Sequence, residues 1–238
     1  MHQAVRAIIL AAGIGERLYP ITAKTPKPLI EVGGKKLIET IIEGLIHNGI
    51  YEIYVVTGHL ADQFEYLPKK YGNCSLRLIF SPHYDTYNNI ASLYTVREHL
   101  GDSIVIDGDH YIRNPQILRP HFHCSGYSGS WVESTTDWLL QTDAEGFVYS
   151  CSRTGGKSGW LLSAISFWTA TDGAKLSIHL EELFMRKKIT DIFWDDIPLF
   201  YCKDDYRLKV REIHSSDVAE IDNHMDLSKL ADEIEGNK

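Results

Sequence analysis

The sequence predicts an α/β fold built on a mostly parallel, doubly wound (Rossmann-like) sheet, with a β-rich lobe inserted beside it. Two observations lead to this prediction. Short apolar strands alternate with helical segments up to about residue 107, and such alternation is typical of parallel sheets with right-handed crossovers. From about Arg113 the pattern changes to short strands separated by turns. We therefore expect one domain, residues 1–238, in which about 113–200 form the inserted lobe.

The composition favours a soluble cytoplasmic protein with a substantial core. The chain has 238 residues, of which 44% are hydrophobic, and these values suit a single globular domain. Its apolar runs are too short to span a membrane, and its first residues lack the basic segment of a signal peptide. Scattered cysteines favour reduced thiols over a disulfide framework; they are Cys74, Cys124, Cys151 and Cys202.

Charge is unevenly distributed along the chain. Residues 1–36 hold six cations and two anions, whereas residues 215–238 hold seven acids and two cations. Cations at one end suit a polyphosphate, and acids at the other could hold a metal ion. The net charge of -8 argues against nucleic-acid binding, because that affinity comes mainly from neutralising phosphates over a wide basic surface.

The first predicted strand, residues 7–10, runs into a loop of small residues. Its continuous apolar side chains are typical of a buried parallel strand. Small residues after it let a ligand approach the backbone, with amide groups free to meet anionic oxygens; they are Ala11, Ala12, Gly13 and Gly15. The loop matches neither the P-loop nor the G-x-G-x-x-G dinucleotide pattern.

Two cations, Arg17 and Lys27, follow this loop. An arginine offers a planar fork of donors, and a lysine offers a point charge on a long stem. Pro26 and Pro28 hold the backbone around Lys27 extended, so that a stiff segment presents the lysine. A phosphate-rich ligand explains this combination better than an ordinary turn with chance basic residues does.

Residues 10–18 (LAAGIGERL), followed by residues 25–28 (TPKP), resemble the signature of the nucleotidyltransferase superfamily. This superfamily includes the sugar-1-phosphate nucleotidyltransferases and the small cytidylyltransferases. The resemblance implies that the loop holds a nucleoside triphosphate, with Arg17 and Lys27 on its phosphates. The implied nucleotide contacts in the loop are Leu10, Ala11, Ala12, Gly13 and Gly15.

The next elements follow in strand–helix order. Apolar residues recur at helical spacing over 37–46, and Asn48-Gly49 is a C-cap signal that ends this helix. We expect strands at 53–57, 76–80 and 104–106, and helices at about 62–70 and 90–100.

Two adjacent amides, Asn88 and Asn89, precede the helix at 90–100. One of them could cap that helix, and both could bind a pyrimidine edge or a ribose. The resemblance places base and ribose contacts in this loop. Residues 84–89 (YDTYNN) are similar to a segment of the bacterial CTP:phosphocholine cytidylyltransferases, and this similarity covers essentially the whole chain. It implies CTP as the nucleotide.

Asp107-Gly108-Asp109 follows the strand at 104–106. An isolated Asp-x-Asp is common in turns. Here, however, it lies at the carboxyl end of a strand, the edge at which open α/β sheets bind ligands, and Mg²⁺ prefers carboxylate and phosphate oxygens. By resemblance Asp109 matches a metal ligand of the family, whereas the role of Asp107 stays open.

The inserted lobe is predicted to contain strands at 129–133, 138–141, 147–150 and 161–168. In the family this part forms the acceptor pocket. His121, His123 and Cys124 lie close enough in sequence to suggest zinc. A fourth ligand is not evident, which favours a solvated loop over a zinc site.

A helix from Thr171 or Asp172 to about Lys187 precedes a segment in which aromatic residues adjoin acids. Core packing is the default explanation of Phe193 and Trp194. Aromatic faces together with Asp195 would also bind an ammonium group. The similarity to the phosphocholine enzymes adds Trp138 to this acceptor site.

Residues 219–222 (AEID) form a short predicted strand that places Glu220 and Asp222 on the same side. Both carboxylates could face one ion, and the resemblance implies a second metal segment here. A terminal helix through Leu227, Leu230 and Ile234 follows. Asp222 could instead cap this helix.

These features predict a Mg²⁺-dependent cytidylyltransferase that transfers CMP from CTP to phosphocholine, giving CDP-choline and pyrophosphate. The acceptor could instead be 2-aminoethylphosphonate, phosphoethanolamine or a sugar phosphate. A catalytically silent nucleotide-sensing domain is the alternative from another class of protein. Such a domain would have lost Lys27 or the carboxylates, and this chain retains them.

Overall fold

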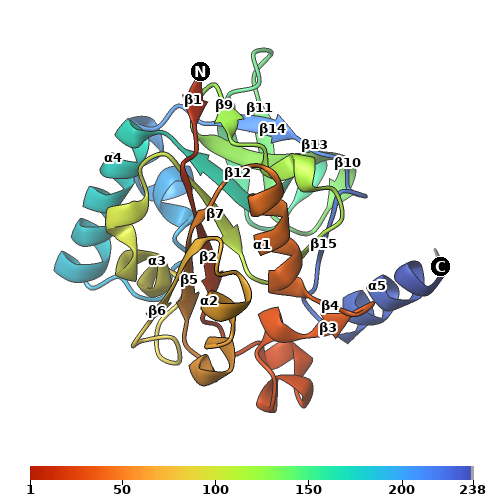
Figure 1. Ribbon diagram of the computed structural model, residues 1–238. Helices are drawn as coiled ribbons and strands as arrows, with labels where there is room; N and C mark the ends of the chain where they lie inside the picture. Colours follow the sequence, from red (N-terminus) through yellow and green to blue (C-terminus); the bar gives the residue numbers. More distant parts are fainter. Residues whose placement is uncertain (237–238) are drawn as a thin grey trace.

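The computed structural model describes residues 1–236. Within them, one sheet of nine strands forms the centre of the molecule, with β12, β11, β13, β7, β2, β5 and β6 in that order (Figure 1). β10 pairs with both β13 and β14. The strands are β2 (Arg6–Ala11), β5 (Glu52–Thr57), β6 (Ser75–Phe80), β7 (Ser103–Asp107), β10 (Gly126–Thr135), β11 (Leu139–Thr142), β12 (Val148–Ser152), β13 (Gly156–Trp168) and β14 (Lys209–Glu212).

The N-terminal half of the sheet is parallel and covered on both faces. β7, β2, β5 and β6 run parallel. Alternate residues of β2 enter opposite cores, with Ile9 in one and Ile8 in the other, as expected for strands that are buried on both sides. α1 (Leu37–His47) and α2 (Leu67–Lys70) cover the first face, and α3 (Ile90–Thr95) and α4 (Ala170–Leu180) the second. The doubly wound prediction is confirmed.

The inserted strands continue the same sheet. β13 pairs antiparallel with β7, with Ile165 opposite Ile106. It also pairs antiparallel with β10 and β11, and β11 pairs antiparallel with β12. The β-rich insertion is therefore present as predicted, and β10 and β13 are longer than the sequence pattern indicated. Whether it binds the acceptor stays a prediction.

Three predicted helices differ from the structure. The helix expected at 62–70 is divided into a 3-10 turn (Ala61–Phe64) and the single turn of α2. Pro68 explains the division, because a proline is tolerated only in the first turn of a helix. α3 ends at Thr95 and is followed by a 3-10 turn, Arg97–His99. α4 begins at Ala170, and a π-helix (Glu181–Arg186) continues it.

Small elements complete the chain. β15 (Val218–Glu220) pairs with β8 (His110–Ile112) outside the main sheet. α5 (His224–Gly236) extends away from the sheet beside the hairpin of β3 (Glu31–Val32) and β4 (Lys35–Lys36) (Figure 1). The two other short pairs are β1 (His2–Gln3) with β9 (His121–Phe122), and β3 (Glu31–Val32) with β4 (Lys35–Lys36). Over residues 1–236, no helix has the length and apolar character needed to cross a bilayer.

Candidate active site

A cavity of 610 Å³ lies at the carboxyl ends of β2 and β7. This is the edge at which open α/β sheets bind their ligands. Its lining contains all the residues of the predicted nucleotide site and two of the three predicted metal ligands. These residues are Leu10, Ala11, Ala12, Gly13, Gly15, Arg17, Lys27, Asn88, Asn89, Asp109 and Asp222, and Asp107 lines the cavity as well.

The glycines of the loop have different roles. Gly15 has a φ of 72°, and a Cβ atom there would lie 3.0 Å from Thr22 Cγ2 and 3.3 Å from Lys27 Cβ. Its lack of a side chain therefore allows both the left-handed turn and the approach of the lysine. A Cβ on Gly13 would meet no protein atom within 4 Å. Since Gly13 lines the cavity, a side chain there would project into the volume available to a ligand and would not clash with other residues.

Gly108 holds the carboxyl end of β7 against the carboxyl end of β2. Its backbone amide donates a hydrogen bond to the Leu10 carbonyl at 2.8 Å. A Cβ atom on Gly108 would lie 3.0 Å from that carbonyl oxygen and 3.0 Å from Pro28 Cγ. This close packing fixes Asp109, which follows Gly108, beside the segment that presents Lys27.

Lys27 lies between two carboxylates. Its Nζ donates to Asp109 Oδ2 at 2.7 Å and to Asp222 Oδ1 at 3.1 Å, and only 12% of its side chain is exposed. Burial lowers the pKa of Lys27, but the two carboxylates outweigh burial and raise it above its usual value. The lysine is therefore a fixed cation at neutral pH.

Arg17 is more exposed than Lys27. Its guanidinium donates to Asp222 Oδ1 at 2.7 Å, with 69% of the side chain accessible. Asp222 thus accepts hydrogen bonds from both predicted phosphate-binding cations. Screening by solvent makes the Arg17 pair weak, so this arginine can exchange its partner for a ligand.

His110 is a site residue that the sequence analysis missed. Its buried Nδ1 lies 3.1 Å from Asp109 Oδ1. Burial opposes protonation, but the hydrogen bond and charge of Asp109, with the charge of Glu220, raise the pKa of His110 to about 9. Burial likewise opposes ionisation of Asp109, yet His110 and Lys27 hold its pKa well below the usual range. A histidine directly after Asp107-Gly108-Asp109 was the available signal.

Three carboxylates from two distant segments converge here. Oxygen atoms of Asp109, Glu220 and Asp222 lie within 4.8 Å of one another. Desolvation by the surrounding protein atoms, together with the charges of Asp109 and Asp222, raises the pKa of Glu220 to about 7. All three offer oxygen, the ligand that Mg²⁺ prefers, so the donor set fits a hard divalent cation. Burial and the charges of Asp109 and Asp195 raise the pKa of Asp107 well above its ordinary value.

Asp222 does not cap α5. The carboxylate of Asp226 accepts hydrogen bonds from the backbone amides of Asp222 and Asn223 at 3.0 and 3.1 Å. Asn223 Oδ1 accepts from the amides of Met225 and Asp226. The capping alternative is therefore wrong, and the Asp222 side chain faces Lys27 and Arg17 instead.

The two asparagines before α3 do not cap it with their side chains. The carbonyl oxygen of the Asn88 side chain accepts from the backbone amide of Asn89 at 2.7 Å. Asn89 Oδ1 accepts a hydrogen bond from the backbone amide of Trp194 at 2.9 Å. The backbone amide of Asn88 donates to the backbone carbonyl of Thr190 at 2.9 Å. This loop is therefore bonded to the predicted acceptor segment.

Of the predicted acceptor residues, Trp194 was assigned wrongly. Its side chain is 2% exposed and packs against Tyr127 and Trp168, so it offers no free face to a ligand, and core packing explains it. Trp138 and Phe193 meet edge to face at 5.8 Å, and Phe193 is 46% exposed.

Asp195 is buried inside the protein. It is 8% exposed, and burial raises its pKa to about 7 although the Tyr127 hydroxyl favours ionisation. The next residue, Asp196, accepts from Arg153 Nε at 2.8 Å. The Arg153 guanidinium lies 3.9 Å from the ring centre of Phe200 and 5.7 Å from that of Trp138, so its closer aromatic contact is with Phe200.

The histidines and cysteine at 121–124 lie elsewhere. His121, His123 and Cys124 line a separate cavity of 760 Å³ together with Arg119 and Arg211. They take no part in the cavity that holds Lys27.

Comparisons with known proteins identify the family. The family model described as nucleotidyl transferase matches residues 6–123. Over 229 residues the chain is 35% identical to choline-phosphate cytidylyltransferase from Streptococcus pneumoniae, covering 95% of this chain and 96% of that protein. It is 31% identical over 229 residues to 2-aminoethylphosphonate cytidylyltransferase from Lancefieldella rimae, covering 95% and 92%.

A solved structure gives the same result. The fold matches that of CTP:phosphocholine cytidylyltransferase from Streptococcus pneumoniae with a TM-score of 0.90 and 36% identity, over 97% of this chain and 99% of that chain. The glycine loop and the Pro-Lys-Pro segment thus indicated the correct relationship, and the chain belongs to the nucleotidyl transferase family.

Proposed function

We propose that this protein is a cytidylyltransferase that transfers CMP from CTP to phosphocholine, releasing pyrophosphate. The observation that carries the proposal is the position of the Lys27 ammonium, 2.7 Å from Asp109 and 3.1 Å from Asp222 beside an open glycine loop. A chain that kept only the fold for sensing nucleotides would not need this arrangement. The names of two relatives that match over nearly their full length support the cytidylyl group.

The reaction requires little covalent chemistry from the protein. A phosphomonoester has a second pKa of about 6 and is largely dianionic at neutral pH. Its oxygen can attack the α-phosphorus of CTP in line without a general base, while the bond to pyrophosphate breaks. Catalysis then depends on positioning and on neutralising charge on the phosphates.

Each basic residue has a distinct role in this proposal. Lys27 exchanges its carboxylate partners for phosphate oxygens when the nucleotide binds, and it stabilises the charge that grows during transfer. Arg17, being exposed, holds the outer part of the triphosphate. Asn88 and Asn89 line the same cavity and bind the base and ribose.

Asp109, Asp222 and Glu220 would hold Mg²⁺. The bound ion would neutralise phosphate charge. His110 orients Asp109 through its hydrogen bond of 3.1 Å. This contact keeps one carboxylate oxygen of Asp109 occupied and leaves the other directed toward Lys27.

A second acceptor, 2-aminoethylphosphonate, is supported by the name of one relative. A primary ammonium can donate hydrogen bonds to a carboxylate, whereas a trimethylammonium binds to aromatic faces such as those of Trp138 and Phe193.

Pyrophosphate release should be measured with four nucleoside triphosphates crossed with phosphocholine, 2-aminoethylphosphonate and phosphoethanolamine. Turnover with CTP and phosphocholine is expected. Turnover with CTP and the phosphonate alone would refute the choline assignment, and binding of CTP without any turnover would favour the sensing domain.

A further inference from the structure

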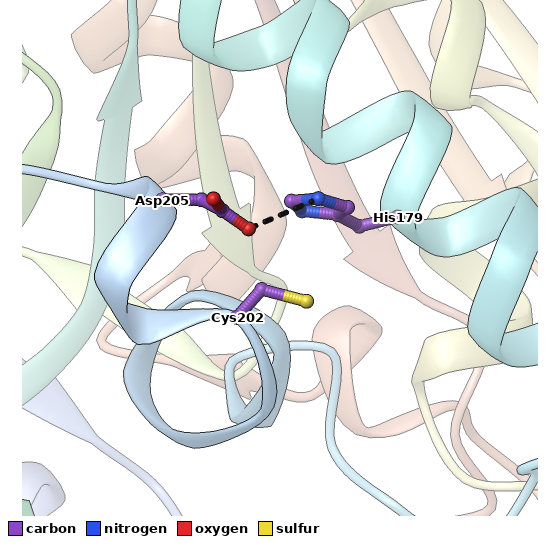
Figure 2. Close-up of side chains that lie close together, drawn as sticks. All are labelled: His179, Cys202 and Asp205. Atoms are coloured by element: carbon purple, nitrogen blue, oxygen red, sulfur yellow. Dashed lines mark ion pairs between the residues drawn. The ribbon is translucent and has the colours of Figure 1, made fainter.

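A second group of side chains with metal-binding character lies away from this cavity. His179 comes from α4, whereas Cys202 and Asp205 come from the turn after the segment Ile197–Tyr201. The ring of His179 faces the Asp205 carboxylate, and the Cys202 thiol lies beside both (Figure 2). One ligand atom from each residue lies within 4.8 Å of the other two.

The separation of His179 and Asp205 fits a bridging ion better than a direct bond. His179 Nε2 lies 3.5 Å from Asp205 Oδ2. A direct N–H···O hydrogen bond is about 2.7–3.2 Å long. Two ligand atoms that are each about 2.0–2.1 Å from a tetrahedral zinc are separated by about 3.4 Å. The observed distance is therefore close to that between ligands of one ion.

The other nitrogen of His179 is already fixed. Its Nδ1 shares a hydrogen bond of 2.8 Å with the Tyr206 hydroxyl, and the two rings meet edge to face at 5.6 Å. Histidines that bind metals almost always have such a partner on the second nitrogen, which sets the tautomer and the ring orientation. With its proton on Nδ1, His179 presents the lone pair of Nε2 toward Cys202 and Asp205.

Neighbouring lysines already have partners. Lys187 Nζ pairs with Glu182 at 2.7 Å, and Lys175 Nζ donates to Asp172 at 3.1 Å and to the backbone carbonyl of Asp205. Neither pair involves the side chain of Cys202 or Asp205. The Asp205 side chain is 58% exposed, which gives an ion a path from solvent.

We propose that His179, Cys202 and Asp205 form a binding site for a zinc-like divalent transition-metal ion, with water as the fourth ligand. A donor set of nitrogen, sulfur and oxygen suits zinc or cobalt and disfavours magnesium and calcium, which prefer oxygen alone. The bound ion joins α4 to the turn at 202–205. It is distinct from the cation assigned to Asp109 and Asp222.

Cobalt titration of the full chain tests this proposal. After removal of metals by a chelator and then of the chelator, Co²⁺ should produce a thiolate-to-cobalt charge-transfer band that saturates at one equivalent, and Zn²⁺ should abolish the band. Cys202→Ser should lose it. Asp205→Asn, at an exposed position, should retain the band but bind at least tenfold more weakly.

Two further variants separate coordination from general effects. Cys74→Ser is the matched control, since Cys74 packs against the opposite core, and it should keep both band and affinity. Tyr206→Phe should weaken binding by about 10- to 100-fold. Zinc should also raise the melting temperature of the unmodified chain and not that of Cys202→Ser. A missing band, a band that persists in Cys202→Ser, or binding only at millimolar metal would overturn the proposal.

Discussion

Asn89 and Trp194, which are 105 residues apart in sequence, are joined by a hydrogen bond from the Trp194 backbone amide to Asn89 Oδ1 at 2.9 Å. The bond connects the loop that lines the nucleotide cavity to the segment that carries Phe193 and Asp195. Under the proposed function, the two substrates would bind on either side of this link. Substitutions at Asn89 should therefore affect the KM for both CTP and the acceptor.

Lys27→Ala should lower kcat far more than it weakens CTP binding. Charge on the phosphates grows in the transition state, and a preorganised donor contributes on the order of 10²–10³ in rate. Steady-state kinetics at saturating acceptor measure this effect. Lys24→Ala, at an exposed lysine three residues earlier, is the control and should be near normal. Normal turnover by Lys27→Ala would remove this lysine from the mechanism.

Arg17→Ala should raise the KM for CTP and leave kcat less affected. The reason is that Arg17 is 69% exposed and pairs with Asp222, so in the proposed function it holds the bound triphosphate rather than the reacting phosphate. Initial rates over a range of CTP concentrations are the measurement. An unchanged KM would contradict the role assigned to Arg17.

Asp109→Asn and Asp222→Asn should each abolish most activity, with partial recovery at high Mg²⁺. Under the proposed function, each substitution removes a charged ligand from a metal ion that few carboxylates would hold. Activity measured as a function of Mg²⁺ concentration tests this, with Asp62→Asn at an exposed position as the control. The assignment fails if either variant keeps the Mg²⁺ dependence of the unmodified chain.

Trp138→Ala should raise the KM for phosphocholine selectively, while Trp194→Ala should lower stability. An aromatic face contributes about 0.5–2 kcal/mol to cation binding, up to roughly thirtyfold in affinity. Removing the buried Trp194 instead leaves a cavity, at a cost of about 3–5 kcal/mol. Kinetics with both acceptors and urea unfolding separate the two effects. If Trp194→Ala is stable and only its KM for phosphocholine rises, our placement of this residue in the core is wrong.

Ionisation of Asp195 should make stability depend on pH. Its pKa is raised to about 7 in the folded protein, so the folded state binds more protons than the unfolded state between about pH 4 and 7. The free energy of unfolding should therefore fall with rising pH in this range, by at most about 1.4 kcal/mol per unit. Asp195→Asn should flatten this part of the profile. Identical profiles for the two chains would contradict the raised pKa.

Local patterns in the sequence predicted the parallel half of the fold and its phosphate-binding edge. The glycine loop and Pro26-Lys27-Pro28 are local signals, since their backbone chemistry is determined by adjacent residues. Asp109, Glu220 and Asp222 each lie in or just after a short strand, and the sequence pattern could place each of them at a strand end. Family resemblance was needed to bring them to one site.

Properties that depend on tertiary packing were harder to predict. Nothing local distinguishes the buried Trp194 from the accessible Phe193, because the two are adjacent in a segment without periodicity. His110 acquires its raised pKa from Asp109 and Glu220, the latter 110 residues away. The cluster of His179, Cys202 and Asp205 also depends on the packing of α4 against the turn at 202–205, and its Cys-x-x-Asp spacing is no recognised motif.

The pairing of β13 with β7 has a consequence for how ligands enter and leave. One strand, Gly156–Trp168, pairs with β7 at residues 165–168 and with β11 at residues 160–161, and it pairs with β10 along nearly its whole length. Within residues 1–236, the parallel half and the inserted strands are therefore joined through one shared strand of the sheet. We expect opening and closing of the cavity to be confined to the loops around it. A change of acceptor preference among relatives can then arise from substitution of side chains while the sheet keeps its structure.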